Sequence, residues 1–252
     1  MRYRIEGDNL QILRIFPEPG EEVYAEAGKM LYKTPGIRMD TRMSGRTLGQ
    51  KLLGALKRAV AGESLFLTHF TAEQSGHEVA FAGDYPGRIQ VIELDGTRAF
   101  LAQKDAFLCA TTGVEMSIAF QRKIGAGLFG GEGFILEKFS GTGIVFLHAG
   151  GDHVVFELQP GERLQVDTGC VVGFDDTVDY SIEFVGSIKT GLFGGEGLFL
   201  TTLTGPGRVI IQSMTLSRLR YQIGQRAGEA GGESTGLDVI KNLGGLLGGS
   251  AD

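Results

Sequence analysis

The chain has 252 residues, including 41 glycines, six prolines and no tryptophan, and its formal net charge is −6. Glycine in this amount, without a Gly-X-Y period or abundant proline, excludes a collagen-like chain. A hydrophobic content of 42% excludes wholesale disorder. The acidic balance argues against a protein that binds nucleic acid by bulk electrostatics.

The sequence carries no signal for export or membrane insertion. The N-terminal stretch MRYRIEGDNLQILRIF lacks the apolar core of a signal peptide, and no apolar run is as long as a spanning helix. Cys109 and Cys170 are isolated in the sequence, which is typical of a reducing compartment. We therefore expect a cytoplasmic protein.

Three kinds of segment recur along the chain, and each occurs three times. The first occurrences are GDNLQILRI from Gly7, PGEEVYAEAGKMLY from Pro19 and GESLFLTHF from Gly62. In the same order, the second occurrences begin at Gly87, Asp95 and Gly131, and the third begin at Gly151, Pro160 and Gly195. Apolar and polar residues alternate within them, as around Val154, Phe156 and Leu158, which predicts half-buried strands separated by glycine-rich turns. We predict an all-β fold with pseudo-threefold internal repetition and roughly six strands per repeat.

An insertion interrupts the first repeat. Leu48, Leu52, Leu56 and Val60 lie four residues apart, which is the spacing of one helix face. We therefore predict one short helical insert over about 46–60. The rest of its surface is basic, through Arg46, Lys51, Lys57 and Arg58.

The repeats do not divide the chain evenly. The chain opens partway through a repeat at Gly7, and the strands within 195–219 open another. Either the ends meet within one subunit and close a ring, or the C-terminal strands of one subunit complete the N-terminal strands of its neighbour. Both arrangements cover sheet edges that are otherwise exposed.

The predicted domain organisation is one β body followed by a tail. Residues 1–223 contain all three repeats and form the body. Residues 224–252 hold nine glycines and are predicted to be a flexible tail, because glycine weakens any helix there.

Four segments, taken in order, carry a resemblance to a known family. They are GKMLYKTPGI near the start, LKRAVAGESLFLTHFTA, GLFGGEG twice, and a closing GPGRVIIQS. Over about residues 3–216 the chain resembles the mitochondrial biogenesis family. The eukaryotic member of that family is named for altered inheritance of mitochondria, and its bacterial and archaeal members are proteins of unknown function.

The resemblance implies a fold and an assembly. Each repeat is expected to be similar to the β domain of the trp RNA-binding attenuation protein (TRAP), a short double-stranded β-helix. A homotrimer with nine such repeats in a ring is also implied. The family supplies no catalytic residues to transfer, and for the eukaryotic relative it implies a role in organising the inner mitochondrial membrane.

The histidines are the first candidates for a metal site. His148 and His153 flank Asp152, and two histidines with one carboxylate are a known ligand set. The glycines between them indicate a turn that points them apart, so we expect surface turn residues. His69 and His77 have no partner pattern, and we expect strand or turn residues. No metal or cofactor is predicted.

Other candidates for catalysis have structural explanations. Cys109 and Cys170 lie in apolar contexts typical of buried, unreactive thiols. Either an acid site or a turn carboxylate accounts for the recurrence of Glu63, Glu132 and Glu196, and we expect the turn. The GTG and GPG motifs at 141–143 and 205–207 lack the lysine of a phosphate loop, and we expect equivalent turns.

The GLFGG loops are the strongest functional candidate. They present large apolar side chains between glycines, and these side chains either pack back on their own sheets or form a contact face for a partner protein or an anionic membrane. The helical insert takes the equivalent place in the first repeat. The predicted contact face consists of Leu128, Phe129, Leu192, Phe193, Leu52, Leu56, Lys51, Lys57 and Arg58.

These observations favour a non-enzymatic oligomeric scaffold or interaction protein. If its contact face binds lipid, the protein is peripheral to a membrane. The alternatives are an RNA-binding ring protein and an enzyme of unidentified type. Basic residues do not recur at one repeat position, since Arg88 is matched by Asp8 and Asp152. RNA binding is therefore the weaker alternative.

Overall fold

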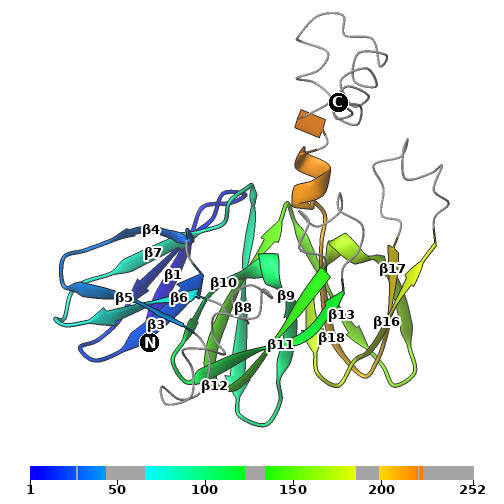
Figure 1. The fold of residues 1–252 in the computed structure, drawn as a ribbon, viewed down its shortest axis with the longest axis horizontal. Helices are drawn as coiled ribbons and strands as arrows, with labels where there is room; N and C mark the ends of the chain where they lie inside the picture. Colours follow the sequence, from blue (N-terminus) through cyan, green and yellow to red (C-terminus); the bar gives the residue numbers. More distant parts are fainter. Residues whose placement is uncertain (27, 44–65, 123–133, 186–198, 221, 224–252) are drawn as a thin grey trace, which may run out of the picture.

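The computed structural model is built almost entirely of antiparallel strands (Figure 1). It describes the chain except for residues 27, 44–65, 123–133, 186–198, 221 and 224–252. The predicted all-β class is confirmed for the described residues. The predicted helical insert (46–60) and the predicted tail (224–252) lie outside them.

The strands form three groups along the chain. The first group contains β1 (Arg2–Glu6), β2 (Ile12–Phe16), β3 (Glu22–Glu26), β4 (Met30–Lys33), β5 (Ile37–Met43), β6 (Phe66–Ala72) and β7 (Val79–Ala82). The second contains β8 (Gly87–Asp95), β9 (Phe100–Gln103), β10 (Phe107–Thr111), β11 (Val114–Arg122) and β12 (Phe134–Gly150). The third contains β13 (His153–Leu158), β14 (Arg163–Asp167), β15 (Val171–Asp175), β16 (Asp179–Phe184), β17 (Phe199–Thr204) and β18 (Gly207–Gln212).

The same strand pairing occurs in all three groups. In the first, β7 lies between β2 and β4, and β6 lies between β3 and β5. In the third, β18 lies between β13 and β15, and β17 lies between β14 and β16. In the second, the single 17-residue strand β12 takes the place of both central strands. One half of it pairs with β8 and β10, and the other half pairs with β9 and β11. Among the described strands, the first group alone has a further strand, β1, beside β2.

This pairing corrects the expectation of part-repeats at the termini. Strands β17 and β18, which cover most of the C-terminal segment in question, pair with strands of their own group. The N-terminal strands likewise find their partners within the first group. Each group is therefore complete, and the strands at the two chain ends do not need one another.

The expected turn at 141–143 is also wrong. These residues lie within the continuous strand β12, whereas residues 205 and 206 separate β17 from β18, which begins at Gly207, as expected of a turn there. A Cβ atom on Gly141 would lie 2.4 Å from the carbonyl oxygen of Gly113, and Gly141 has a φ of +97°. Glycine is needed here because the strand passes close to a neighbouring backbone.

One strand pair joins each group to the next. β10 of the second group pairs with β3 of the first, and β15 of the third pairs with β9 of the second. These two junctions link nine strands of the three groups into one path of a large sheet. Figure 1 shows the first group at one end of the body, the second in the middle and the third at the other end.

The apolar core is shared across both junctions. Leu108 of β10 belongs to the cluster formed by the first group around Leu13 and Phe70. Val172 of β15 belongs to the cluster formed by the second group around Phe100. At each junction, therefore, the later group contributes a side chain to the core of the earlier one.

A short helix over 216–220 follows the last strand and was not predicted. Its start is capped by Thr215, whose Oγ1 accepts a hydrogen bond from the Arg218 backbone at 3.1 Å. The helix is held to the body by an ion pair of 2.8 Å between Arg218 and Asp167. The threonine that opens TLSR (215–218) was the available sequence signal for this N-cap.

The middle core should be sensitive to cavities. Phe100 is fully buried, so Phe100→Ala is expected to lower the free energy of unfolding by about 3–5 kcal/mol. Phe184 is 52% exposed, and Phe184→Ala is the matched control with a much smaller loss. Urea denaturation of both variants measures this difference, and equal losses would contradict the assigned core.

Candidate interaction surface

The predicted contact face falls on residues outside the described part of the chain. This applies to all nine of its members, Leu128, Phe129, Leu192, Phe193, Leu52, Leu56, Lys51, Lys57 and Arg58. The strands that flank these segments are described. They are β5 and β6, β11 and β12, and β16 and β17, which hold the same place in each group.

The structure does not bring the histidine candidates together. His148 is not a surface turn residue as expected but a buried residue of β12, packed edge-on against the Tyr85 ring. Burial lowers the pKa of its imidazole. His153 instead contacts the Gln90 side chain at 2.8 Å. Within the described ranges, no group of three histidine, cysteine or acidic residues is placed to hold a metal.

The other two histidines lie where they were expected. His69 is a residue of strand β6, and His77 precedes β7 and contacts the Thr34 hydroxyl at 3.0 Å. The cysteines also match the prediction: Cys109 and Cys170 are both buried free thiols, and burial raises the pKa of each.

One acid–base cluster lies on the sheet of β3, β5 and β6. The Glu22 carboxylate contacts Nδ1 of His69 at 2.8 Å, accepts a hydrogen bond from Thr71 at 2.6 Å and receives both Nη atoms of Arg42 at 3.1 Å. Burial alone would raise the pKa of Glu22, but these hydrogen bonds outweigh it and lower that pKa. The carboxylate is thus held charged by its neighbours, which is typical of a structural network.

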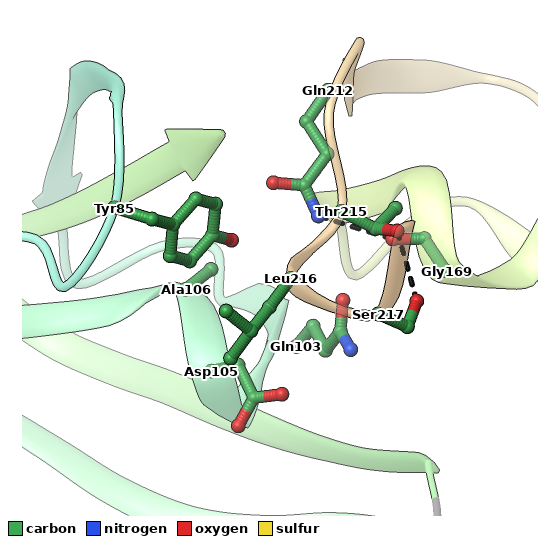
Figure 2. A pocket seen from close by; sticks show the side chains of 9 residues that line it. All are labelled: Tyr85, Gln103, Asp105, Ala106, Gly169, Gln212, Thr215, Leu216 and Ser217. Carbon is green, nitrogen blue, oxygen red and sulfur yellow. Dashed lines mark hydrogen bonds between the residues drawn. The ribbon is translucent and has the colours of Figure 1, made fainter. Parts of the chain in front are cut away.

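A small cavity lies where the C-terminal helix meets the body. Figure 2 shows Tyr85 and Leu216 lining it from different segments. The space of about 30 Å³ open to water centres inside it has room for a few water molecules. The lining is closed by polar groups, and Gln212 Nε2 donates to the Gly169 carbonyl at 3.0 Å.

Strand β4 presents an apolar edge to solvent. Among the described strands, β4 pairs only with β7, on one side. Met30, Leu31 and Tyr32 are 36%, 52% and 37% exposed, respectively, and are consecutive in the strand. An unpaired edge with large apolar side chains is a ready site for pairing with another strand.

Strand β14 is the second free edge of interest. Within the described part of the chain, β14 pairs only with β17, on one side. Its Leu164 is partly buried against the core of the third group, and Arg163 and Gln165 are exposed. The repeat pattern predicted uncovered sheet edges but did not identify these two strands, because alternation of residue type does not tell which strand has a neighbour.

The described residues contain no helix that is both long and apolar enough to cross a membrane.

Glu137 of β12 is a buried acid near the first junction. It is fully buried, and neither of its carboxylate oxygens has a hydrogen-bond partner within the described part of the chain. Burial raises the pKa of Glu137 well above its usual range, the nearby Glu26 raises it further, and Lys104 opposes the shift. We therefore expect Glu137 to be protonated and neutral in the folded protein at neutral pH.

This raised pKa predicts a pH dependence of stability. The folded state holds a proton that the unfolded state releases, so the free energy of unfolding falls as the pH rises above the unfolded pKa of Glu, by at most about 1.4 kcal/mol per pH unit. In Glu137→Gln this contribution is absent, so urea denaturation between about pH 5 and 8 should show a shallower decline. The exposed Glu115→Gln is the control, and a decline unchanged in Glu137→Gln would contradict the assignment.

Comparison with known proteins agrees with the motifs quoted above. The family model described as Mitochondrial biogenesis AIM24 matches residues 3–214. An uncharacterized protein, M6_Spy0233, of Streptococcus pyogenes serotype M6 is 30% identical over 223 residues, which cover 86% of this chain and 88% of that protein. The crystal structure of protein SPYM3_0169 from Streptococcus pyogenes is similar with a TM-score of 0.72 and 25% identity, over 89% of this chain and 99% of that one. The chain belongs to the mitochondrial biogenesis AIM24 family.

Proposed function

We propose that this protein is a non-enzymatic scaffold that assembles as a homotrimer in the cytoplasm, where it contacts a partner protein or a membrane surface. In this proposal the three groups of strands are TRAP-like repeats, each a short double-stranded β-helix, and the trimer arranges nine of them in a ring. The identical strand pairing within the three groups supports the repeat assignment.

The exposure of β4 is the observation that carries the proposal. Leu31 is 52% exposed, whereas Leu108 of β10 and Val172 of β15 are fully buried. Strands β4, β10 and β15 hold the same place in the three groups, each paired with the last strand of its group. β10 and β15 are covered by a preceding group, whereas no other strand of the described residues covers β4.

The complementary edge lies on β14. Its counterparts β3 and β9 are covered by a following group, and their residues Val23 and Phe100 are fully buried. The corresponding Leu164 of β14 remains partly exposed. Among the described strands, the first group thus carries one uncovered junction strand and the third group carries the other, which favours association between copies.

The energetics also support association. Complete burial of a leucine or methionine side chain contributes about 1.5–3 kcal/mol relative to exposure. The edge also carries backbone N–H and C=O groups that a second strand would satisfy. An unpaired β4 forgoes both contributions.

The proposed scaffold would bind its partner through the predicted contact face. Residues such as Phe129 and Phe193 lie in connections between equivalent strands, β11–β12 and β16–β17. A trimer would multiply these connections, and several weak contacts on one assembly bind far more tightly than one. The partner would be a protein or an anionic membrane surface.

Oligomeric state gives the first test. Light scattering at micromolar concentration is expected to give three times the 27.0 kDa chain mass. Leu31→Lys should shift the protein toward monomer, because a charge would be buried at the proposed edge. Val154→Lys is the matched control, since Val154 is 51% exposed on β13, and the counterpart strand β8 pairs with the first group only through the isolated Leu10–Gly87 bridge among the described residues. A stable wild-type monomer would overturn the scaffold proposal.

Liposome flotation tests the membrane version of the contact face. With vesicles that contain anionic lipid, the intact protein is expected to float, and Phe129→Ser/Phe193→Ser should float less because it loses apolar side chains. Vesicles of neutral lipid are the control for charge. Failure of the intact protein to float, or equal flotation of the variant, would leave a protein as the partner of this face.

A further inference from the structure

We propose that two copies of the chain join through one antiparallel strand pair, β4 of one copy with β14 of the next, in a single defined register. This inference rests on the proposed self-assembly and adds the surface, the partner strand and the register. The residue pairs, β4 first, are Tyr32 with Val166, Lys33 with Gln165, and Thr34 with Leu164.

A shared irregularity aligns β4 with the strands that already form junctions. The pairing of β4 with β7 shifts register between Met30 and Tyr32. The same shift occurs in β10 between Phe107 and Cys109, and in β15 between Val171 and Gly173. Tyr32 therefore corresponds to Cys109 and to Gly173, without reliance on residue type.

The pairing within each group aligns β14 with the other junction strands. Val23 of β3 lies opposite Phe70, Phe100 of β9 lies opposite Phe139, and Leu164 of β14 lies opposite Leu203. Phe70, Phe139 and Leu203 occupy matching places in the repeated segments GESLFLTHF, GEGFILEKF and GEGLFLTTL. Leu164 therefore corresponds to Val23 and Phe100.

The two internal junctions have the same register once corresponding residues of the three groups are compared. At the first, Cys109 pairs with Ala25 and Thr111 pairs with Val23. At the second, Gly173 pairs with Ala102 and Asp175 pairs with Phe100. Replacing each residue by its counterpart in β4 and β14 gives Tyr32 with Val166 and Thr34 with Leu164.

The side chains at the two edges suit such a junction. Leu108 and Val172 each lie at the register shift of their strand, between the two residues that bound it. Both pack into the core of the preceding group. Leu31 is their counterpart, and it would enter the third group's core beside Leu164 and Val166, which belong to or pack against that core. This contact would bury the most exposed residue of β4.

The proposed contact runs from head to tail. β4 lies with the first group and β14 with the third, in the sheet of β16 and β17 at the opposite end of the body (Figure 1). They do not meet within one chain, so closure of the ring inside a single subunit does not occur in this structure. A contact between different surfaces repeats until it closes a ring or forms a filament.

Engineered disulfides test the register. Lys33→Cys/Gln165→Cys places two thiols directly opposite one another, within reach of a bond after mild oxidation. The native thiols Cys109 and Cys170 are buried and stay in place. We expect most of the double variant to run as a covalent trimer on a non-reducing gel, and either single variant to run as one chain. Lys33→Cys/Arg163→Cys is the control, because it is two residues out of register and beyond disulfide reach.

Each outcome separates this inference from the proposed function. Suppose that the wild-type protein is a trimer. If Lys33→Cys/Gln165→Cys then forms no cross-links, or the control cross-links equally well, the register is wrong and the scaffold proposal stands. A covalent ladder beyond three chains would support the register and overturn the trimer. A monomer would overturn both.

Hydrogen exchange tests the same contact without substitutions at the paired positions. Backbone amides on the free sides of β4 and β14 are expected to be protected in the unmodified protein, and to exchange faster in Leu31→Lys. Amides of β13, an edge strand with no corresponding junction, give the reference for an open edge. Exchange in β4 and β14 as fast as in β13 would overturn the inference.

Discussion

Backbone hydrogen bonding at strand edges is the constraint on which this structure depends. Each group of strands contributes two small sheets, and sheets of three short strands leave edges that compete for partners. Within the chain, four of these edges are closed in two pairs, β10 with β3 and β15 with β9. The same junctions also carry Leu108 and Val172 into the neighbouring core, so hydrogen bonding and apolar burial reinforce each other.

The polar chemistry of the described residues is largely engaged in holding the fold. Glu22 is surrounded by donors from β5 and β6. Asp167 accepts a hydrogen bond from the Gly169 backbone and pairs with Arg218 of the C-terminal helix. These groups stabilise local structure. The uncovered sheet edges are therefore the surface of the described residues that would gain most from binding a partner.

Several elements were accessible from sequence because their signals are local. Alternation of apolar and polar residues predicted strands, and the apolar settings of Cys109 and Cys170 predicted their burial, as observed. His148 was misplaced because β12 runs to Gly150, so the residue lies in a strand and not in the adjacent turn. The glycines at 141 and 143 were misread for a related reason: glycine permits either a turn or a close approach of two backbones.

By itself, the sequence determined the all-β class, the threefold recurrence of its segments and the family, because each depends on residue patterns within short stretches. Only the tertiary structure decided that β17 and β18 complete their own group, and that β4 and β14 are left without a covering group. The physical reason is that strand pairing uses backbone groups that nearly every residue shares. Residue pattern tells which face of a strand is apolar, but the neighbour at its edge is set by the path of the whole chain.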